Sequence, residues 1–334
     1  MSNSLKIPDR SEWESCFATF LHDSGKRPVN TKVTHPFARA SLIPGPLAGF
    51  SGQGGFALVF RLRDQTGREW AVRCPIRMPS HFHRDHATGL SKWSPPGALV
   101  PHLVLPKLIP EALFVGGAWQ DVTVMPWVDG GTLEDIVNGP NPADWDSLAT
   151  QVESLVTALA ESGVAHGDLQ PKNIIRSANN TLILVDYDSF LIPGGATGIS
   201  PVGGLRGFGH PHFTKRSADR HFDPNMDTFA GLVLLLSLRA LAKNPSLLRR
   251  ESEDGFVISA DELESPGITF GTLERMAEPV ASLASALRRL CEDQSGGLAP
   301  WSSVIHRSYY PRYVLRLPTL PPPPSKLAYS PLVL

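Results

Sequence analysis

The spacing of hydrophobic side chains changes along this chain and predicts two structurally different parts. Near the N-terminus the spacing is i, i+4, i+7, i+8, which predicts a short amphipathic helix containing Trp13, Phe17, Phe20 and Leu21. Between residues 47 and 73 apolar positions alternate, which predicts two antiparallel strands joined at 64–67. A helix at 81–93 and strands at 111–116 and 120–128 complete a small β-rich part.

The second half of the chain has mostly helical periodicity. Asn141 followed by Pro142 predicts the start of a helix that ends near Gly163. Short strands are expected at 173–175 and 182–185, followed by an apolar helix at 227–242 with an N-cap at 223–225. A last helix at 272–291 should be kinked by Pro279, and the proline-rich end cannot build a core.

These patterns predict an α+β fold and four segments. An N-terminal extension covers 1–46, and a β-rich lobe covers 47–129. A larger helical lobe covers 130–310, and a proline-rich tail covers 311–334. The 334 residues suffice for two domains or one large two-lobed domain.

Composition and charge argue against several classes of protein. Lys and Arg number 31 against 32 Asp and Glu, so no global basic field attracts nucleic acid or an anionic membrane. The longest apolar run, at 230–242, is interrupted by Ser237 and Arg239 and is too short for a bilayer span of about 20 residues. Three widely spaced cysteines and a charged N-terminus favour neither a disulfide framework nor a signal peptide. We therefore expect a cytoplasmic protein that binds neither nucleic acid nor membrane.

A glycine cluster between two predicted strands is the first candidate for chemistry. Gly52, Gly54 and Gly55 precede the apolar run 56–60. Backbone N–H groups approach phosphate oxygens most easily where side chains are absent, so this hairpin is suited to cover a phosphate. An ordinary glycine-rich hairpin explains the cluster equally well.

A second group of polar residues is more specific. Asp168 and Asn173 lie in the run His-Gly-Asp-Leu-Gln-Pro-Lys-Asn at 166–173, and Asp186 follows a predicted strand thirteen residues later. Carboxylate and amide oxygens are the ligands that Mg²⁺ prefers, and a further carboxylate near a hydroxyl can act as a base. The three residues together therefore indicate an Mg²⁺–phosphate site.

These motifs resemble the protein kinase superfamily from about Leu47 to Asp293, and in particular bacterial kinase-like proteins with HGDLQ and VDYD motifs. The resemblance implies a bilobal kinase-like fold, with a small β-rich N-lobe and a larger helical C-lobe. It implies that ATP is the nucleotide and Mg²⁺ the metal. The positions that the resemblance assigns to nucleotide binding are Gly52, Gly54, Gly55, Val59, Ala71, Arg73, Met125, Trp127 and Val128.

The same resemblance assigns the catalytic and structural positions. Asp168 matches the catalytic base, and Asn173 and Asp186 match the metal ligands. Arg73 stands for the strand lysine that binds the α/β-phosphates, and Lys172 is expected to reach the transferring phosphate in place of the lysine that Gln170 replaces. Asp227 matches the helix aspartate that anchors the catalytic loop, and 209–213 match the end of the activation segment.

Several departures from the family pattern bear on activity. Arg73 is not equivalent to lysine, because a planar guanidinium and a compact ammonium reach phosphate differently. The helix glutamate that pairs with the lysine is missing unless Asp85 replaces it, although a solvated surface carboxylate is favoured at that position. Gly167 removes the usual receptor for a phosphorylated activation loop, and Asp188 adds a negative charge near the metal site. These departures indicate that the kinase mechanism is partly retained, whereas its regulation is lost.

Three hypotheses follow. The first is an ATP- and Mg²⁺-dependent kinase that acts on Ser or Thr of a protein partner in bacterial signalling. The second is a pseudokinase that binds nucleotide weakly or not at all and acts as a protein-interaction scaffold. The third is a small-molecule kinase of the aminoglycoside-phosphotransferase type, against which the extended segment 189–213 counts. The substrate and the oligomeric state are left open by the sequence.

Overall fold

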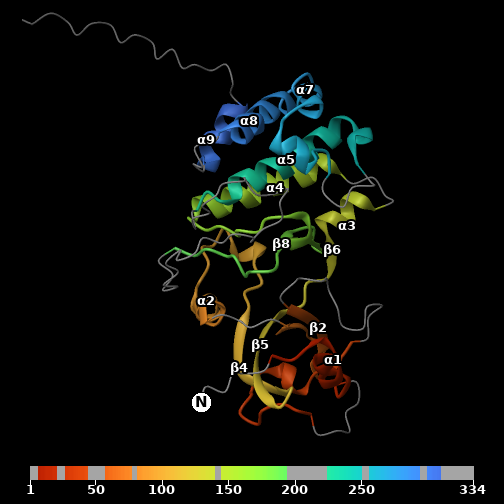
Figure 1. Cartoon of the computed structure of the whole chain (residues 1–334), viewed down its shortest axis with the longest axis vertical. Helices are drawn as coiled ribbons and strands as arrows, with labels where there is room; N and C mark the ends of the chain where they lie inside the picture. The colour runs from red at the N-terminus through yellow and green to blue at the C-terminus, as the bar shows by residue number, and fades with distance from the viewer. Residues whose placement is uncertain are drawn as a thin grey trace, which may run out of the picture.

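The computed structural model describes residues 7–20, 27–43, 57–76, 81–139, 144–193, 224–249, 256–293 and 299–309. A curled β-sheet forms one end of the molecule and a stack of helices forms the other (Figure 1). Two separate hydrophobic cores correspond to these ends. The predicted α+β fold is confirmed, and the arrangement is consistent with a bilobal kinase-like architecture.

The N-terminal sheet is antiparallel, with the strand order β1-β2-β3-β5-β4. The predicted hairpin at 64–67 is confirmed, and Gly67 has a positive φ of 84° in its turn. The two later strands are also confirmed, although the first begins at Lys107 and not at Glu111. The strands are β1 (Ser41–Leu42), β2 (Ala57–Arg63), β3 (Glu69–Pro75), β4 (Lys107–Val115) and β5 (Ala118–Pro126).

Helix α1 (Arg10–Ala18) packs on one side of this sheet. The ring of Phe17 stacks on Phe60 of β2 with centroids 3.8 Å apart, and Trp13 Nε1 donates to the carbonyl oxygen of Pro75 at 2.9 Å. Phe20 and Phe37 are fully buried in the same core. The N-terminal residues thus complete the hydrophobic core of the sheet.

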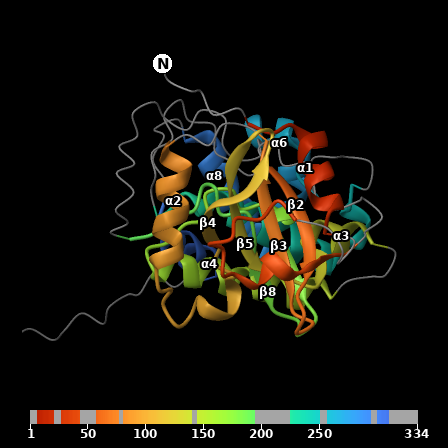
Figure 2. The same cartoon turned by 90° about the horizontal axis from the view of Figure 1, so that it is seen from below.

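Helix α2 (His81–Lys92), predicted at 81–93, lies on the opposite side of the sheet from α1 (Figure 2). Leu90 of α2 belongs to the core of the helical part, not to the core of the sheet. Arg84 of α2 forms an ion pair with Asp121 of β5 at 2.8 Å. The helix therefore contacts both parts of the molecule.

The C-terminal part is built around helix α5 (Asp227–Lys243), which is buried along most of its length. It packs against α4 (Trp145–Glu161), and the two backbones approach closely at Gly231, where a Cβ would lie 2.9 Å from the side chain of Val156. The other helices of this part are α3 (Leu133–Asn138), α6 (Ala260–Glu264), α7 (Ile268–Leu273), α8 (Val280–Glu292) and α9 (Trp301–Tyr309). A small antiparallel sheet has the order β6 (Gly130–Thr132), β7 (Ile174–Ser177) and β8 (Leu182–Leu184).

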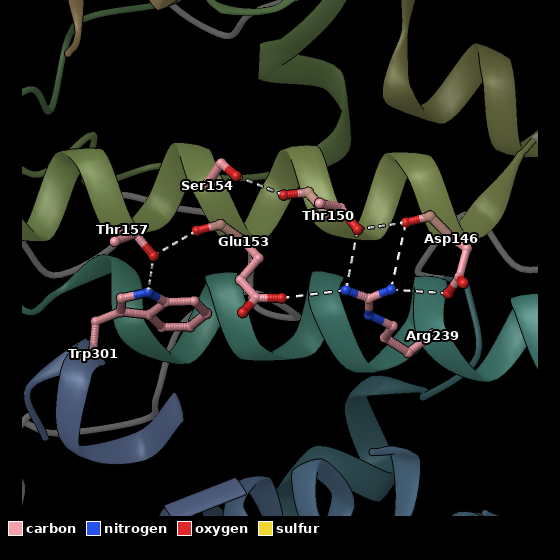
Figure 3. A network of polar contacts seen from close by, with 7 residues as sticks. All are labelled: Asp146, Thr150, Glu153, Ser154, Thr157, Arg239 and Trp301. Atoms are coloured by element: carbon pink, nitrogen blue, oxygen red, sulfur yellow. Dashed lines mark hydrogen bonds and ion pairs between the residues drawn. The ribbon is translucent and has the colours of Figure 1, made fainter. Parts of the chain in front are cut away.

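A polar network ties α4 to α5 and α9 (Figure 3). Arg239 of α5 contacts Asp146 Oδ1 at 2.8 Å and Glu153 Oε2 at 3.3 Å. Trp301 Nε1 donates to the hydroxyl of Thr157 at 2.8 Å.

Within the described residues, no helix has the length and apolar character needed to cross a bilayer.

Two helix boundaries and one predicted helix cap differ from the prediction. The first long helix has Asp144 as its N-cap, and Asn141 lies outside the described residues. Helix α5 has Met226 at the N-cap position without a side-chain cap, and Asp223 again lies outside the described residues. The single kinked helix at 272–291 is wrong: Pro279, which lacks an N–H and fits a helix start, precedes α8, so α7 and α8 are separate.

Candidate functional site

Helix α5 holds the loop at 166–173 from inside the protein. The carboxylate of Asp227, at the start of α5, accepts hydrogen bonds from the backbone N–H groups of His166 and Gly167, the latter at 2.9 Å. Burial raises the pKa of Asp227, and the charge of His166 and these N–H groups act in the opposite direction. His166 is itself fully buried and donates from Nε2 to the carbonyl of Val185 at 2.9 Å. Asp227 thus fixes the loop, in the role that the resemblance implies.

Gly167 is required by the path of the backbone. Its φ is +77°, and a Cβ at this position would lie 2.4 Å from the carbonyl oxygen of Ser189. Any side chain here would therefore be strained and would clash with the segment that follows Asp188. An arginine at this position, as in the commoner motif, would therefore meet the backbone at Ser189.

The carboxylate of Asp168 is oriented by two amide side chains. Asn173 Nδ2 and Gln170 Nε2 donate to Asp168 Oδ2 at 2.9 and 2.8 Å, and Asn173 Nδ2 also donates to the Asp168 carbonyl at 2.9 Å. Because the Asn173 nitrogen makes these bonds, its Oδ1 is the atom able to ligate a cation. Gln170, identified from the sequence only as a missing lysine, helps to orient the candidate base.

Asp186 has the features of a ligand for a cation. It follows β8 in the left-handed region, with φ +65°, a conformation that costs energy and is enriched at functional sites. Its Oδ1 is shielded from solvent without a hydrogen-bond partner. Burial raises its pKa, while the charge of Arg73 acts to lower it. The backbone N–H of Val185 donates to the Asn173 carbonyl at 3.0 Å, which keeps Asp186 beside the loop at 166–173.

The residues present therefore fit a divalent cation held by Asp186 and Asn173, the pair that the sequence indicates. Among the described residues, no cluster of three or more His, Cys, Asp or Glu side chains forms a metal site. A cation bound here would need further ligands from nucleotide phosphates or water, as is usual for Mg²⁺.

Arg73 of β3 faces two carboxylates. Its Nη2 donates to Asp188 Oδ2 and lies 3.6 Å from Asp186 Oδ1. Burial alone lowers the pKa of the Arg73 guanidinium, but the charges of Asp188 and Asp186 outweigh it and raise that pKa. Arg73 is therefore a fixed cation beside the candidate metal ligand.

Asp85 does not replace the missing glutamate. It is exposed on α2, whereas its neighbour His86 is buried and donates from Nε2 to the carbonyl of Phe190 at 2.6 Å. Helix α2 therefore directs a histidine toward the interior, and the carboxylates that contact Arg73 come from the segment after β8.

The strands bring several predicted nucleotide-binding residues onto one face of the sheet. Val59 lies opposite Arg73 in the register of β2 and β3, and Ala71 lies opposite Met125 in that of β3 and β5. Residues two apart on a strand share a face, so these four positions line the same side. Phe60, which contacts α1, points to the other side.

The remaining predicted residues have other surroundings. The backbone N–H of Trp127 donates to the Glu69 carbonyl at 3.0 Å, and its ring is covered by Arg61, 4.6 Å from the centroid. Val128 follows in the half-buried connection to the helical part. Lys172 lies 3.5 Å from Glu134 of α3 and is more than half exposed, so its predicted contact with phosphate stays a prediction. Outside the described residues lie Gly52, Gly54, Gly55 and the segment 209–213.

The sequence does not predict the contacts of two residues at the site. It indicates Asp188 only as an added negative charge near the metal site, whereas in the structure Asp188 pairs with Arg73. Tyr187 is buried; its hydroxyl donates to the Leu184 carbonyl at 2.6 Å and accepts from the Val104 N–H at 2.9 Å. A phenylalanine could make neither bond, so the tyrosine in the VDYD motif was the available signal.

Comparisons with known proteins point to the same superfamily. The chain is 24% identical over 262 residues to calmodulin-binding receptor-like cytoplasmic kinase 2 of Arabidopsis thaliana, which covers 75% of this chain and 62% of the plant protein. It is 24% identical over 139 residues to the probable serine/threonine-protein kinase PknB of Lactococcus lactis, covering 41% of this chain and 22% of that protein. No family model matches the chain. The chain thus spans less than two thirds of either relative, and the similarity supports a protein kinase-like superfamily.

Proposed function

We propose that this protein binds ATP with Mg²⁺ and transfers the terminal phosphoryl group to a Ser or Thr hydroxyl of a protein partner. The observation that carries the proposal is the arrangement of Asp168, which Asn173 and Gln170 orient on a loop held by Asp227. Two further features support the proposal: a shielded carboxylate oxygen on Asp186 that has no hydrogen bond, and the cation of Arg73, 3.6 Å from that oxygen.

In this proposal Asp168 orients the acceptor hydroxyl and accepts its proton. The hydroxyl oxygen forms a bond to the γ-phosphorus as the bond from that phosphorus to the β-γ bridging oxygen breaks, and the products are a phosphorylated side chain and ADP. Arg73 stabilises negative charge on the nucleotide phosphates, and Asp186 and Asn173 hold the metal. When bound, Mg²⁺ neutralises charge on the phosphate oxygens.

The side-chain environment of the sheet suits the base of the nucleotide. Val59, Ala71 and Met125 present apolar surface on the face that carries Arg73. An apolar surface beside a cation matches an adenine joined to a triphosphate. We propose that the backbone of 126–128, at the connection between the sheet and the helical part, binds the adenine edge and that the protein acts in the cytoplasm in signalling.

One observation favours a second candidate function, that of a pseudokinase scaffold. Arg73 is already paired with Asp188, so ATP must compete with a carboxylate for this cation. If the competition is lost, the protein presents its surface to a partner without phosphoryl transfer.

The test is ATP binding followed by transfer. Melting of the full chain is followed during ATP titration with Mg²⁺, with Mn²⁺ and with EDTA, and radiolabelled ATP is then offered with a mixture of candidate protein substrates. We expect metal-dependent stabilisation, with transfer removed and binding retained in Asp168→Ala, because Asp168 faces the hydroxyl and not the nucleotide. Binding without transfer under any condition would favour the scaffold, and equal stabilisation in EDTA and Mg²⁺ would contradict the metal site.

A further inference from the structure

Arg73, the cation of β3, has its acidic partners in the segment after β8 and not on helix α2. The acidic residue of α2 is Asp85, which is exposed, whereas its neighbour His86 is buried and bonds to the Phe190 carbonyl. Arg73 instead contacts Asp186 and Asp188, which follow β8. The carboxylate that contacts the strand cation is therefore on the same segment as the candidate metal ligand.

The two contacts of Arg73 are not equal. Nη2 hydrogen-bonds to Asp188 Oδ2, whereas Asp186 Oδ1 lies 3.6 Å away and has no hydrogen-bond partner. Arg73 and Asp188 are similarly shielded, with about a quarter of each side chain exposed. Asp188 thus takes the direct hydrogen bond, and Asp186 remains available to a cation.

The backbone around Asp188 is held on both sides. Before it, the Tyr187 ring is buried and its hydroxyl bonds to the Leu184 carbonyl and the Val104 N–H. After it, the Phe190 N–H donates to the Tyr187 carbonyl at 3.1 Å, and the Phe190 carbonyl accepts from His86. These contacts place the carboxylate of Asp188 beside Arg73 with little freedom to move away.

We propose that Asp188 is a positioning residue that replaces the missing helix carboxylate. It holds Arg73 toward the nucleotide phosphates and keeps Arg73 from pairing fully with Asp186. This inference rests on the proposed function. One positive and two negative side chains leave this cluster with a charge of −1, which favours a divalent cation. Without the charge of Asp188, the guanidinium would close on Asp186, whose Oδ1 has no other partner, and would compete with the metal.

The test measures how much Mg²⁺ is needed for ATP binding. Asp188→Asn keeps the size of the side chain and removes its charge, and Asp188→Glu keeps the charge. We expect the Mg²⁺ concentration for half-maximal ATP-induced stabilisation to rise about tenfold or more in Asp188→Asn, as for the loss of one charged hydrogen bond. Asp188→Glu should recover most of the wild-type requirement. Asp146→Asn, in the α4–α5 network, is the matched control and should leave the requirement unchanged.

A second measurement does not depend on nucleotide. Urea unfolding of Arg73→Met, Asp188→Asn and the double variant forms a double-mutant cycle. We expect the double variant to lose less stability than the sum of the two single losses, because either change alone already removes the Arg73–Asp188 contact.

The outcomes separate the two ideas. If wild type binds ATP but Asp188→Asn matches the Asp146→Asn control, the positioning role is wrong and the proposed function stands. Additive losses in the cycle would also overturn the inference. If wild type binds no ATP with either metal, the proposed function fails, and the cycle alone then decides whether Asp188 holds Arg73.

Discussion

The α4–α5 helix pair and the Arg73–Asp186–Asp188 cluster each place an arginine between two carboxylates, but the carboxylates lie on different kinds of backbone. In the helix pair, Arg239 contacts Asp146, Glu153 and the hydroxyl of Thr150 (Figure 3). In the cluster, Asp186 keeps one shielded oxygen without a hydrogen bond and a backbone in the left-handed region.

This difference separates a structural contact from a candidate binding site. The helix network joins α4 and α5, whose apolar faces already form the core. Its polar groups therefore add to the packing of these two helices. The cluster joins β3 to the segment after β8, where the backbone of Asp186 is in the left-handed region, a conformation that is enriched at functional sites. The same residue types thus serve packing between two regular helices in one place and lie in a segment with left-handed backbone in the other.

The largest expected effect comes from removing the carboxylate of Asp227, which joins helix α5 to the loop at 166–173. Asp227→Ala should lower the free energy of unfolding by about 2–6 kcal/mol, because it leaves two buried N–H donors unpaired at about 1–3 kcal/mol each. Urea unfolding measures this loss. Asp227→Asn, which keeps one acceptor, should lose less. Equal and small losses in both variants would show that the loop is held by other contacts.

The second largest loss of stability is expected from a substitution at Gly167, in the same loop at 166–173. Gly167→Ala should cost about 2–4 kcal/mol, since it adds a left-handed penalty to a clash with the Ser189 carbonyl. Gly97→Ala is the matched control, because a Cβ there meets nothing within 4 Å. Thermal melting of both variants checks this expectation, and a Gly167→Ala protein as stable as the control would contradict the described backbone path.

A smaller effect is expected within the helix network. Arg239→Met should lower stability by about 1–2 kcal/mol, because it removes charged hydrogen bonds whose partners are partly solvated. ATP binding should be unchanged, which would separate this arginine from Arg73. Arg10→Met, which breaks an exposed pair with Glu14, is the control and should be close to neutral. Weaker ATP binding in Arg239→Met would mean that the two regions are coupled.

The smallest effect concerns Asp64, a carboxylate whose hydrogen bonds are completed within its own hairpin. It accepts from the backbone and hydroxyl of Thr66, from the Arg68 N–H and from Trp70 Nε1. These bonds, led by the Thr66 hydroxyl, lower its pKa from 3.8 to about 2. Because the folded pKa is depressed, the stabilisation is present above pH 3.8 and is lost as the pH falls toward 2.

Asp64→Asn tests this pH dependence. The variant should be less stable than wild type at pH 5, and the difference should shrink at pH 2.5, as measured by urea unfolding. A difference that does not change between the two pH values would show that the carboxylate charge contributes nothing to the turn.

Local patterns predicted most elements, whereas long-range partners could not be predicted. Alternation identified β2 and β3, and helical spacing identified α2 and α5, because each signal lies within the element. The start of α5 at residue 227 was predicted correctly, but its cap was not. At α5, the carboxylate of Asp227 bonds to the catalytic loop, and no side chain caps the helix.

The same limit applies to the candidate site. The motif order indicated Asp168, Asn173 and Asp186, and the first two are in direct contact. The pairing of Arg73 with Asp188 joins residues 115 positions apart and depends on how β3 packs against the segment after β8. The motif shows that a charge is present at Asp188, but only the fold shows what that charge contacts.

The measurement that tests the central claim most directly is isothermal titration of ATP with Mg²⁺ into wild type, Arg73→Met and Arg73→Lys. If Arg73 binds phosphate, Arg73→Met should weaken ATP binding by about 1.5–3 kcal/mol, or about ten- to a hundredfold, while Arg73→Lys stays near wild type. A loss below about tenfold in Arg73→Met would contradict the assignment of this cluster as the phosphate site.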